Sequence, residues 1–163
     1  MIDRFFKPLL GGIFCDSSLS TSSIMFEFIF SMMSLGSNVL PSEGMQAIPD
    51  QIYNHLPYES ALLNTSVSQV TSHAATLLTG EQIKGQAVII ATDGPSATEL
   101  ITGLNVPRYK GATCIYFSAD TCPEISNALV LNGTGQGPIN HLCVPSNVSQ
   151  SYAPIGKSLI STT

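Results

Sequence analysis

Charged side chains are scarce in this sequence. Asp, Glu, Lys and Arg together make up 10% of the 163 residues, whereas hydrophobic residues make up 44%. An ordinary soluble domain carries about 25% charged residues, so this chain has too little charge for a fully solvated surface. The composition predicts either a membrane protein or a segment whose neighbours in a larger protein cover part of its apolar surface.

Long hydrophobic runs are also missing. The two longest, residues 5–15 and 24–35, are interrupted by charged residues or glycine. Both fall short of the ~20 apolar residues that a membrane-spanning helix needs. Residues 1–7 lack the basic and then apolar order of a secretory signal. We therefore expect no transmembrane segment and no secretion, and an intracellular location in the cytoplasm or a plastid.

Basic residues do not cluster. The net charge is -5, and no Lys or Arg occurs between Lys7 and Lys84. Nucleic acid is therefore not an expected partner, because its phosphates are neutralised by grouped Lys and Arg side chains.

Metal-ligand and hydrolase motifs are absent as well. The four cysteines include no CxxC pair, and the three histidines lie in unrelated contexts without an HExxH or GxSxG motif. We expect no metal site and four reduced, mostly buried thiols. No catalytic residue is assigned.

The first third of the chain predicts helices. Residues 20–23 offer hydroxyl N-caps to residues 24–35, which are apolar on nearly every face and are followed by Gly36. A helix that is apolar all round must be buried on several sides. A second, short helix is predicted over residues 47–56, before Pro57.

After Pro57 the pattern predicts strands. Residues 87–92 are continuously apolar, as in a strand buried on both faces, and residues 96–99 form a capping box that opens a helix. Strand, glycine turn and helix would form a βα unit. We therefore predict a fold of the α+β or α/β class that combines apolar helices, this βα unit and an antiparallel sheet. The other predicted strands are residues 61–64, 66–70, 75–78, 82–84, 112–118, 128–131, 139–144 and 158–161.

Residues 132–138 are rich in glycine. Closely spaced glycines let backbone amides approach a phosphate, but a dinucleotide-binding loop follows a strand and opens a helix. Here the glycines precede Pro138 and a predicted strand, so we predict a turn between two strands.

Taken in order, several segments resemble the flavin-containing amine oxidase and phytoene desaturase-like superfamily of FAD-dependent oxidoreductases. The resemblance covers almost the whole chain, and it depends on the order of motifs that are weak singly. They are residues 4–14, 21–28, 40–49, 63–67, 88–95, 131–133, 144–146 and 152–154.

The resemblance implies three parts. Residues 1–57 would be the helical part of a substrate domain, residues 58–106 part of an FAD-binding domain, and residues 107–163 the antiparallel sheet of the substrate domain. In the complete protein it implies FAD as the cofactor and a small, apolar substrate. The family's amino-terminal GxGxxG unit and its flavin-closing segment have no counterpart here. We therefore expect an internal fragment that is inactive alone.

Six site residues are implied by the resemblance. Val67 would lie against the adenine through its backbone, and Ala91, Thr92 and Gly94 would lie where the chain passes the cofactor. On the substrate side, Gly44 and Met45 match the turn that leads into the helix before the adenine strand. Each of these residues also fits a packed strand end or turn.

Two other functions stay open. The chain could be a non-catalytic module that docks on a partner flavoprotein, or on another copy of itself, through its apolar helices. It could also associate with a membrane surface through Phe5, Phe6 and the helix over residues 24–35, although almost no basic residue lies beside that helix.

Overall fold

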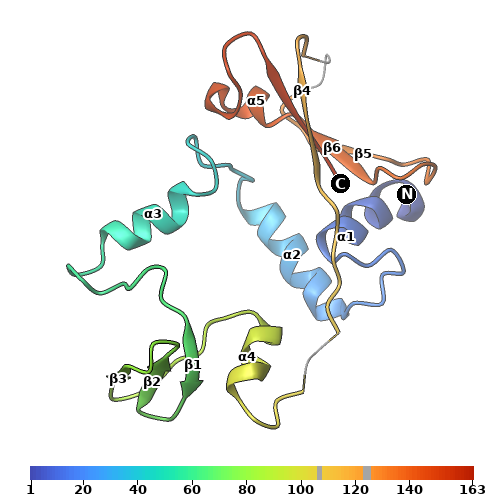
Figure 1. The fold of residues 1–163 in the computed structure, drawn as a ribbon. Coiled ribbons are helices and arrows are strands. Elements are labelled where there is room, and N and C mark those ends of the chain that lie inside the picture. The colour runs from blue at the N-terminus through green and yellow to red at the C-terminus, as the bar shows by residue number, and fades with distance from the viewer. Residues whose placement is uncertain (106–107, 123–125) are drawn as a thin grey trace. The chain divides into compact units, whose positions relative to one another are not determined.

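The computed structural model describes residues 1–105, 108–122 and 126–163. The chain divides into two units (Figure 1). The first unit comprises Met1–Ile52 and Lys110–Thr163, and the second comprises Tyr53–Tyr109. The units follow from the contacts between residues and do not by themselves assign a role to either part. The resemblance assigns domain roles to residues 1–57, 58–106 and 107–163, and these roles stay predictions.

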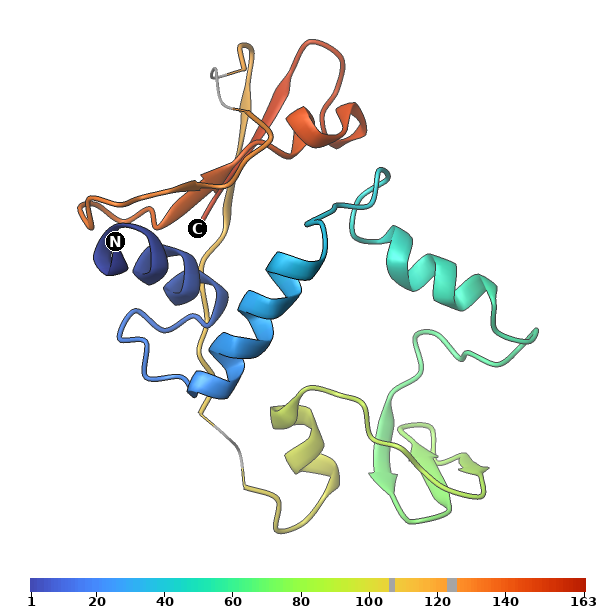
Figure 2. The ribbon, with the colours of Figure 1, turned by 180° about the vertical axis from the view of Figure 1, so that it is seen from behind.

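The first unit begins with two consecutive helical segments. A π-helical segment, η1 (Ile2–Phe6), continues directly into α1 (Lys7–Ile13), whose first turn contains Pro8. Because the helix continues through Phe6, Pro8 lies in its interior and, having no N–H, leaves one intrahelical hydrogen bond unformed. Pro8, Leu9 and Leu10 are buried, and α1 contacts β6 (His141–Cys143) in both views of the ribbon (Figures 1 and 2).

The apolar helix α2 (Ser23–Leu35) has the boundaries that its end signals predict. The Ser22 hydroxyl accepts a hydrogen bond from the Ile24 backbone N–H, and Gly36 follows the last turn. No residue of α2 is buried in this chain. The helix contacts η1 through aromatic rings, since the ring centroids of Phe26 and Phe30 each lie 6.2 Å from that of Phe6.

Four antiparallel strands form the sheet of the first unit, in the order β4-β7-β6-β5. The predicted antiparallel sheet is therefore confirmed. Between β6 and β7 the chain forms α5 (Pro145–Val148) and a 3-10 segment, η2 (Gln150–Tyr152). Val144, just before α5, is 1% exposed and is the most deeply buried side chain among the described residues. The other strands are β4 (Ile115–Ala119), β5 (Val130–Leu131) and β7 (Ser158–Thr162).

The second unit contains a three-stranded antiparallel sheet. It consists of β1 (Val67–Val70), β2 (Ala74–Leu77) and β3 (Gln82–Lys84), with β2 in the middle. The predicted hairpin turn before β3 is confirmed. The strand predicted over residues 61–64 is wrong, because this segment forms a turn in which Asn64 has φ 53°. The short helix α3 (Ala47–Asn54) spans the boundary between the two units and confirms the helix predicted there.

Of the predicted βα unit, the helix forms but the strand does not. Residues 87–92 form no strand, and the Ile89 side chain is 89% exposed. A continuously apolar strand is stable only between neighbouring strands and under covering layers, which the described part of the chain does not place around this segment. The following helix, α4 (Gly94–Leu100), begins after Asp93, so Ser96 lies inside the helix rather than at its cap.

The structure confirms an α+β fold. Within the ranges that the structure describes, no helix is both long and apolar enough to cross a membrane.

Candidate functional site

A cavity of about 680 Å³ lies in the first unit. Its wall is formed by α1 and the loop after it, by residues 111–113, by the turn between β5 and β6, and by Thr163. Much of this wall is backbone, because glycines contribute at several places. The glycines are Gly11, Gly12, Gly111, Gly133, Gly135 and Gly137.

The glycine-rich turn is held in shape by one side chain, that of Asn132. Its Nδ2 atom donates to the carbonyl oxygens of Gln136 and Ile139, each at 2.7 Å. Its Oδ1 atom accepts hydrogen bonds from the backbone N–H and the hydroxyl of Thr134, at 3.1 and 2.6 Å. The predicted turn between two strands is confirmed, since these residues connect β5 to β6.

Helix α1 approaches the sheet closely at Gly12. A Cβ atom at this position would lie 2.9 Å from the Asn140 Nδ2 atom and from the His141 ring. Asn140 Nδ2 donates to the Pro8 carbonyl oxygen at 2.7 Å and thereby joins the helix to the strand. Burial lowers the pKa of His141. Burial therefore favours the neutral imidazole.

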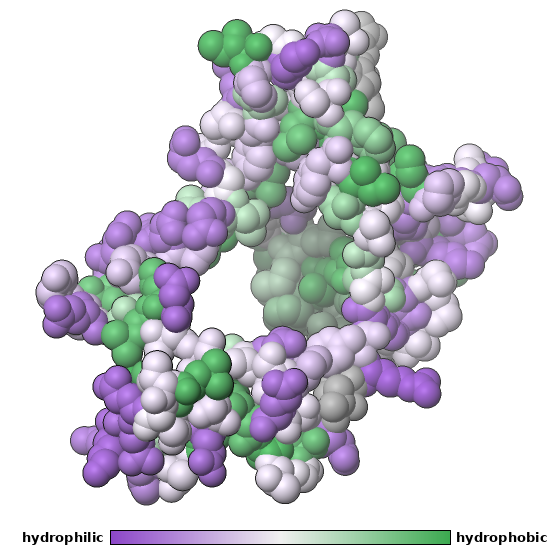
Figure 3. Space-filling model, viewed as in Figure 1, coloured by the Kyte–Doolittle hydropathy of each residue, from purple (hydrophilic) through white to green (hydrophobic). Residues whose placement is uncertain are grey.

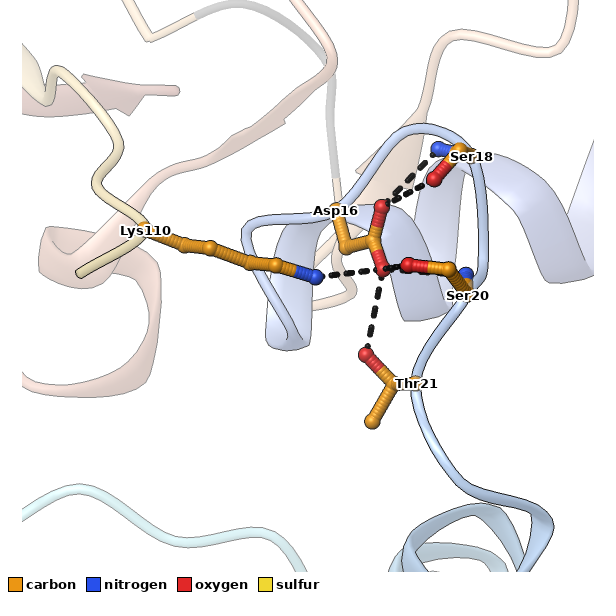
Figure 4. A network of polar contacts seen from close by, with 5 residues as sticks. All are labelled: Asp16, Ser18, Ser20, Thr21 and Lys110. Carbon is orange, nitrogen blue, oxygen red and sulfur yellow. Dashed lines mark hydrogen bonds and ion pairs between the residues drawn. The ribbon is translucent and has the colours of Figure 1, made fainter. Parts of the chain in front are cut away.

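The cavity wall also contains a highly connected carboxylate, that of Asp16 (Figure 4). Its oxygens accept hydrogen bonds from the backbone N–H and the hydroxyl of both Ser18 and Ser20, and from the Thr21 hydroxyl. Lys110 Nζ completes the network with an ion pair of 2.6 Å. Lys110, with Ser18 and Ser20, holds the pKa of Asp16 well below its usual range. The network therefore favours the ionised carboxylate of Asp16, whose negative charge lies beside the Lys110 ammonium.

The cofactor-side residues predicted from the resemblance all lie in the second unit. Val67 begins β1 and is paired with Leu77, and β1 contacts α4, where Gly94 is the first residue. The Tyr109 hydroxyl lies so close to Gly94 that a Cβ atom there would be 1.8 Å from it. Ala91 and Thr92 are exposed and precede α4 without forming a strand.

The two predicted substrate-side residues lie in the turn before α3, in the first unit. Gly44 has φ +88°, a conformation that glycine adopts without strain, and the Met45 side chain is 60% exposed. A hydrogen bond connects this turn to η2, because the Tyr152 hydroxyl donates to the Pro41 carbonyl oxygen at 2.9 Å. None of the six predicted site residues lines the cavity.

Sequence reasoning missed the Asp16 network. Its only local signal is a carboxylate followed by several hydroxyl residues, and such runs are common in ordinary loops. No group of His, Cys, Asp and Glu side chains suited to a metal ion occurs within residues 1–105, 108–122 and 126–163.

The family described as flavin containing amine oxidoreductase matches residues 1–163. The chain belongs to this family. Among curated proteins, none matches the sequence.

The described residues do not fit the pyrophosphate of a flavin dinucleotide. That group is bound by the amides of a glycine turn that follows a strand and opens a helix. Residues 87–92 before α4 form no strand, and the glycine-rich turn connects two antiparallel strands.

Proposed function

We propose that this chain is a segment of an FAD-dependent oxidoreductase of the phytoene desaturase-like type and that it is inactive alone. In the complete protein, further sequence covers its apolar surface and supplies the site for the cofactor's phosphates. The substrate of that protein is a small, apolar molecule. Hydride transfer belongs to the flavin, while the protein orients the reactants.

The exposure of α2 is the observation that carries this proposal. Ile24 and Leu35, near its two ends, are 73% and 82% exposed, and hydrophobic residues gather over the helix (Figure 3). Full burial of one large apolar side chain contributes about 1.5–3 kcal/mol. Several such side chains left in water favour association with a covering surface. The other exposed apolar residues of α2 are Met25, Phe28, Phe30 and Met32.

The segment that the resemblance places beside the cofactor, residues 87–94, supports the same proposal. Residues 87–92 have the sequence of a strand buried on both faces but form none here. Strands supplied by further sequence would pair with this segment and cover both of its faces. Ala91, Thr92 and Gly94 would then lie at the end of a strand, where the resemblance places them beside FAD.

Recovery of the adjoining genomic sequence tests the proposal. We expect an upstream reading frame with a GxGxxG unit after a strand pattern and a downstream frame with the flavin-closing segment. Flanking frames that lack both features would argue against the proposal.

A second candidate function is a non-catalytic module that docks on a separate flavoprotein chain. The same exposed face of α2 favours it. This module would form a stable, soluble complex with that chain. Size-exclusion chromatography coupled to light scattering would measure the mass of the complex. An isolated chain that stays monodisperse and binds no flavoprotein would argue against the module.

A further inference from the structure

The cavity of the first unit lies in line with β7 of the four-stranded sheet. β7 is paired with β4 on one side and with β6 on the other. Residues 111–113, before β4, and residues 138–140, before β6, line the cavity together with Thr163. The chain before β4 runs on from the strand without a turn, as both views show (Figures 1 and 2). The two segments therefore face each other across the line of β7, and we call the space between them the strand slot.

The width of the strand slot fits one strand. Neighbouring strands of a sheet lie about 4.8 Å apart, so the two neighbours of β7 are roughly 9.6 Å apart. The same separation between residues 111–113 and 138–140 leaves room for a single strand. A strand advances about 3.3 Å per residue, so three residues span the length of these walls.

On the β6 side, the register of the sheet directs the backbone of Ile139 toward the strand slot. Thr163 and His141 form a reciprocal pair, in which each N–H donates to the other's carbonyl oxygen, at 3.0 and 3.2 Å. Pairs of this kind recur at every second residue of an antiparallel ladder. The next pair beyond His141 would use Ile139, whose N–H makes no hydrogen bond within residues 1–105, 108–122 and 126–163.

On the β4 side, the same alternation directs the backbone of Thr113 toward the strand slot. Adjacent residues of a strand turn their N–H and C=O groups to opposite sides, so Thr162 points to β4 where Thr163 points to β6. Thr162 is paired with Ile115, and Thr113 is the next residue of the same orientation. Its N–H likewise has no partner in the described part of the chain. Each wall of the slot thus presents a backbone donor that a strand between them would accept.

Both walls are held in place by side-chain contacts. The Lys110–Asp16 ion pair joins the segment before residue 111 to the loop after α1. On the other wall, Asn140 Nδ2 donates to the Pro8 carbonyl oxygen of α1. The two adjacent glycines of α1 also line the cavity, and their lack of side chains lets another backbone approach closely. The slot is therefore formed before any strand enters it.

We propose that the strand slot binds an extended peptide segment that continues β7 and forms backbone hydrogen bonds with Thr113 and Ile139. The inference rests on the proposed function, because this segment belongs to the further sequence that completes the protein. Continuity with β7 favours this occupant over a second copy of the chain. A continuous segment enters in register and loses less translational and rotational freedom than a separate molecule does.

The test appends a tail of four residues to Thr163 of the full chain. A Thr-Val-Thr-Val tail favours strand formation, whereas a Pro-Pro-Thr-Val tail lacks the first two N–H donors and is unsuited to a central strand. Hydrogen exchange followed by NMR measures the amides of Thr113 and Ile139. We expect the first tail to slow exchange at both amides by about tenfold or more and the second tail to leave both unchanged.

Alkylation of the thiols by iodoacetamide provides a second readout. The expectation of mostly buried thiols is wrong, because Cys114 and Cys122 are exposed and Cys15 and Cys143 are only partly covered. Cys15 lines the cavity, so the Thr-Val-Thr-Val tail should slow its alkylation several-fold. Cys122 follows the far end of β4 and should react at the same rate with either tail.

Thr113→Pro separates pairing in the strand slot from folding. It removes an N–H that has no partner without the tail, so it should change the stability of the untailed chain little. It should also weaken the protection that the Thr-Val-Thr-Val tail gives to the Ile139 amide. If Thr113→Pro does not fold, the comparison of the two tails decides the question.

Three results would overturn the proposal. They are the absence of protection by the Thr-Val-Thr-Val tail, equal protection of Ile139 in Thr113→Pro, and protection that rises with protein concentration and so arises between copies. Because the tails are designed, a failure here leaves the genomic test of the proposed function standing. Flanking frames without the expected features would likewise leave the result on the strand slot standing.

Discussion

Lys110 Nζ lies 2.6 Å from Asp16 Oδ2, although 94 residues separate the two in sequence. The ion pair joins the loop after α1 to the segment that leads into β4. The Asp16 side chain is almost fully covered, whereas that of Lys110 is about half exposed. The network fixes one wall of the cavity through side-chain contacts rather than through regular secondary structure.

The Asp16 network predicts loss of stability in acid. Lys110, with Ser18 and Ser20, lowers the pKa of Asp16 in the folded state, so the folded protein binds this proton more weakly than the unfolded chain does. The stabilisation is fully present above about pH 4, the ordinary range of an aspartate, and is lost as the pH falls below it. Urea unfolding of Asp16→Asn should show a lower midpoint at pH 7 and a weaker dependence on pH below 4.

Asp120→Asn provides a matched control. It removes another carboxylate that pairs with a lysine, Lys157, but the Asp120 side chain is 82% exposed. Exposed pairs contribute little because solvent screens them. An Asp120→Asn effect as large as that of Asp16→Asn would contradict the account.

Two adjacent glycines of α1 should respond oppositely to alanine. In Gly12→Ala the new Cβ would clash with Asn140 and His141, and such overpacking destabilises by about 1–3 kcal/mol. In Gly11→Ala the nearest atom, the Asp16 carbonyl oxygen, is at an ordinary 3.4 Å. Alanine there should stabilise the helix by up to about 1 kcal/mol. Thermal unfolding measures the stability of both variants. An equal change in stability for Gly12→Ala and Gly11→Ala would contradict the close packing of α1 on β6.

The glycine-rich turn should depend on Asn132. Asn132→Ala removes the group that donates to two carbonyl oxygens and accepts from Thr134. Because these bonds are exposed and water can replace them, we expect a loss of about 0.5–1.5 kcal/mol. Hydrogen exchange should also become faster at the amides of residues 133–138. Thr134→Val is the control, because it removes only the hydroxyl contact and keeps a β-branched side chain. An Asn132→Ala protein with unchanged exchange would contradict the assigned role.

Leu35→Lys tests whether α2 is uncovered in this chain. The residue is 82% exposed, and a cation at the last helical turn interacts favourably with the helix dipole. We expect the free energy of unfolding to change by no more than about 0.5 kcal/mol and light scattering to show less association. Leu10→Ala in the buried face of α1 should instead cost about 2–5 kcal/mol. A cost of that size for Leu35→Lys would show that α2 is already covered.

The sequence predicts those parts of the fold whose signals are local. Ser22 and Gly36 mark the ends of α2, and the turn at residues 79–80 places β2 and β3 in one hairpin. The strand predicted over residues 87–92 fails because a buried strand needs partners that lie elsewhere in a fold.

The site is less predictable than the fold. Asp16 and Lys110 meet only after folding, and no local pattern relates positions so far apart in sequence. The closeness of Tyr109 to Gly94 is likewise a tertiary contact. The resemblance supplied Val67, Ala91, Thr92, Gly94, Gly44 and Met45 as site residues, and their roles toward FAD and substrate stay predictions.

A titration of the purified chain with FAD, followed by visible absorption and flavin fluorescence, tests the central claim most directly. The account predicts free-flavin spectra throughout and no coloured complex after desalting. A yellow complex of one flavin per chain that survives desalting would contradict it.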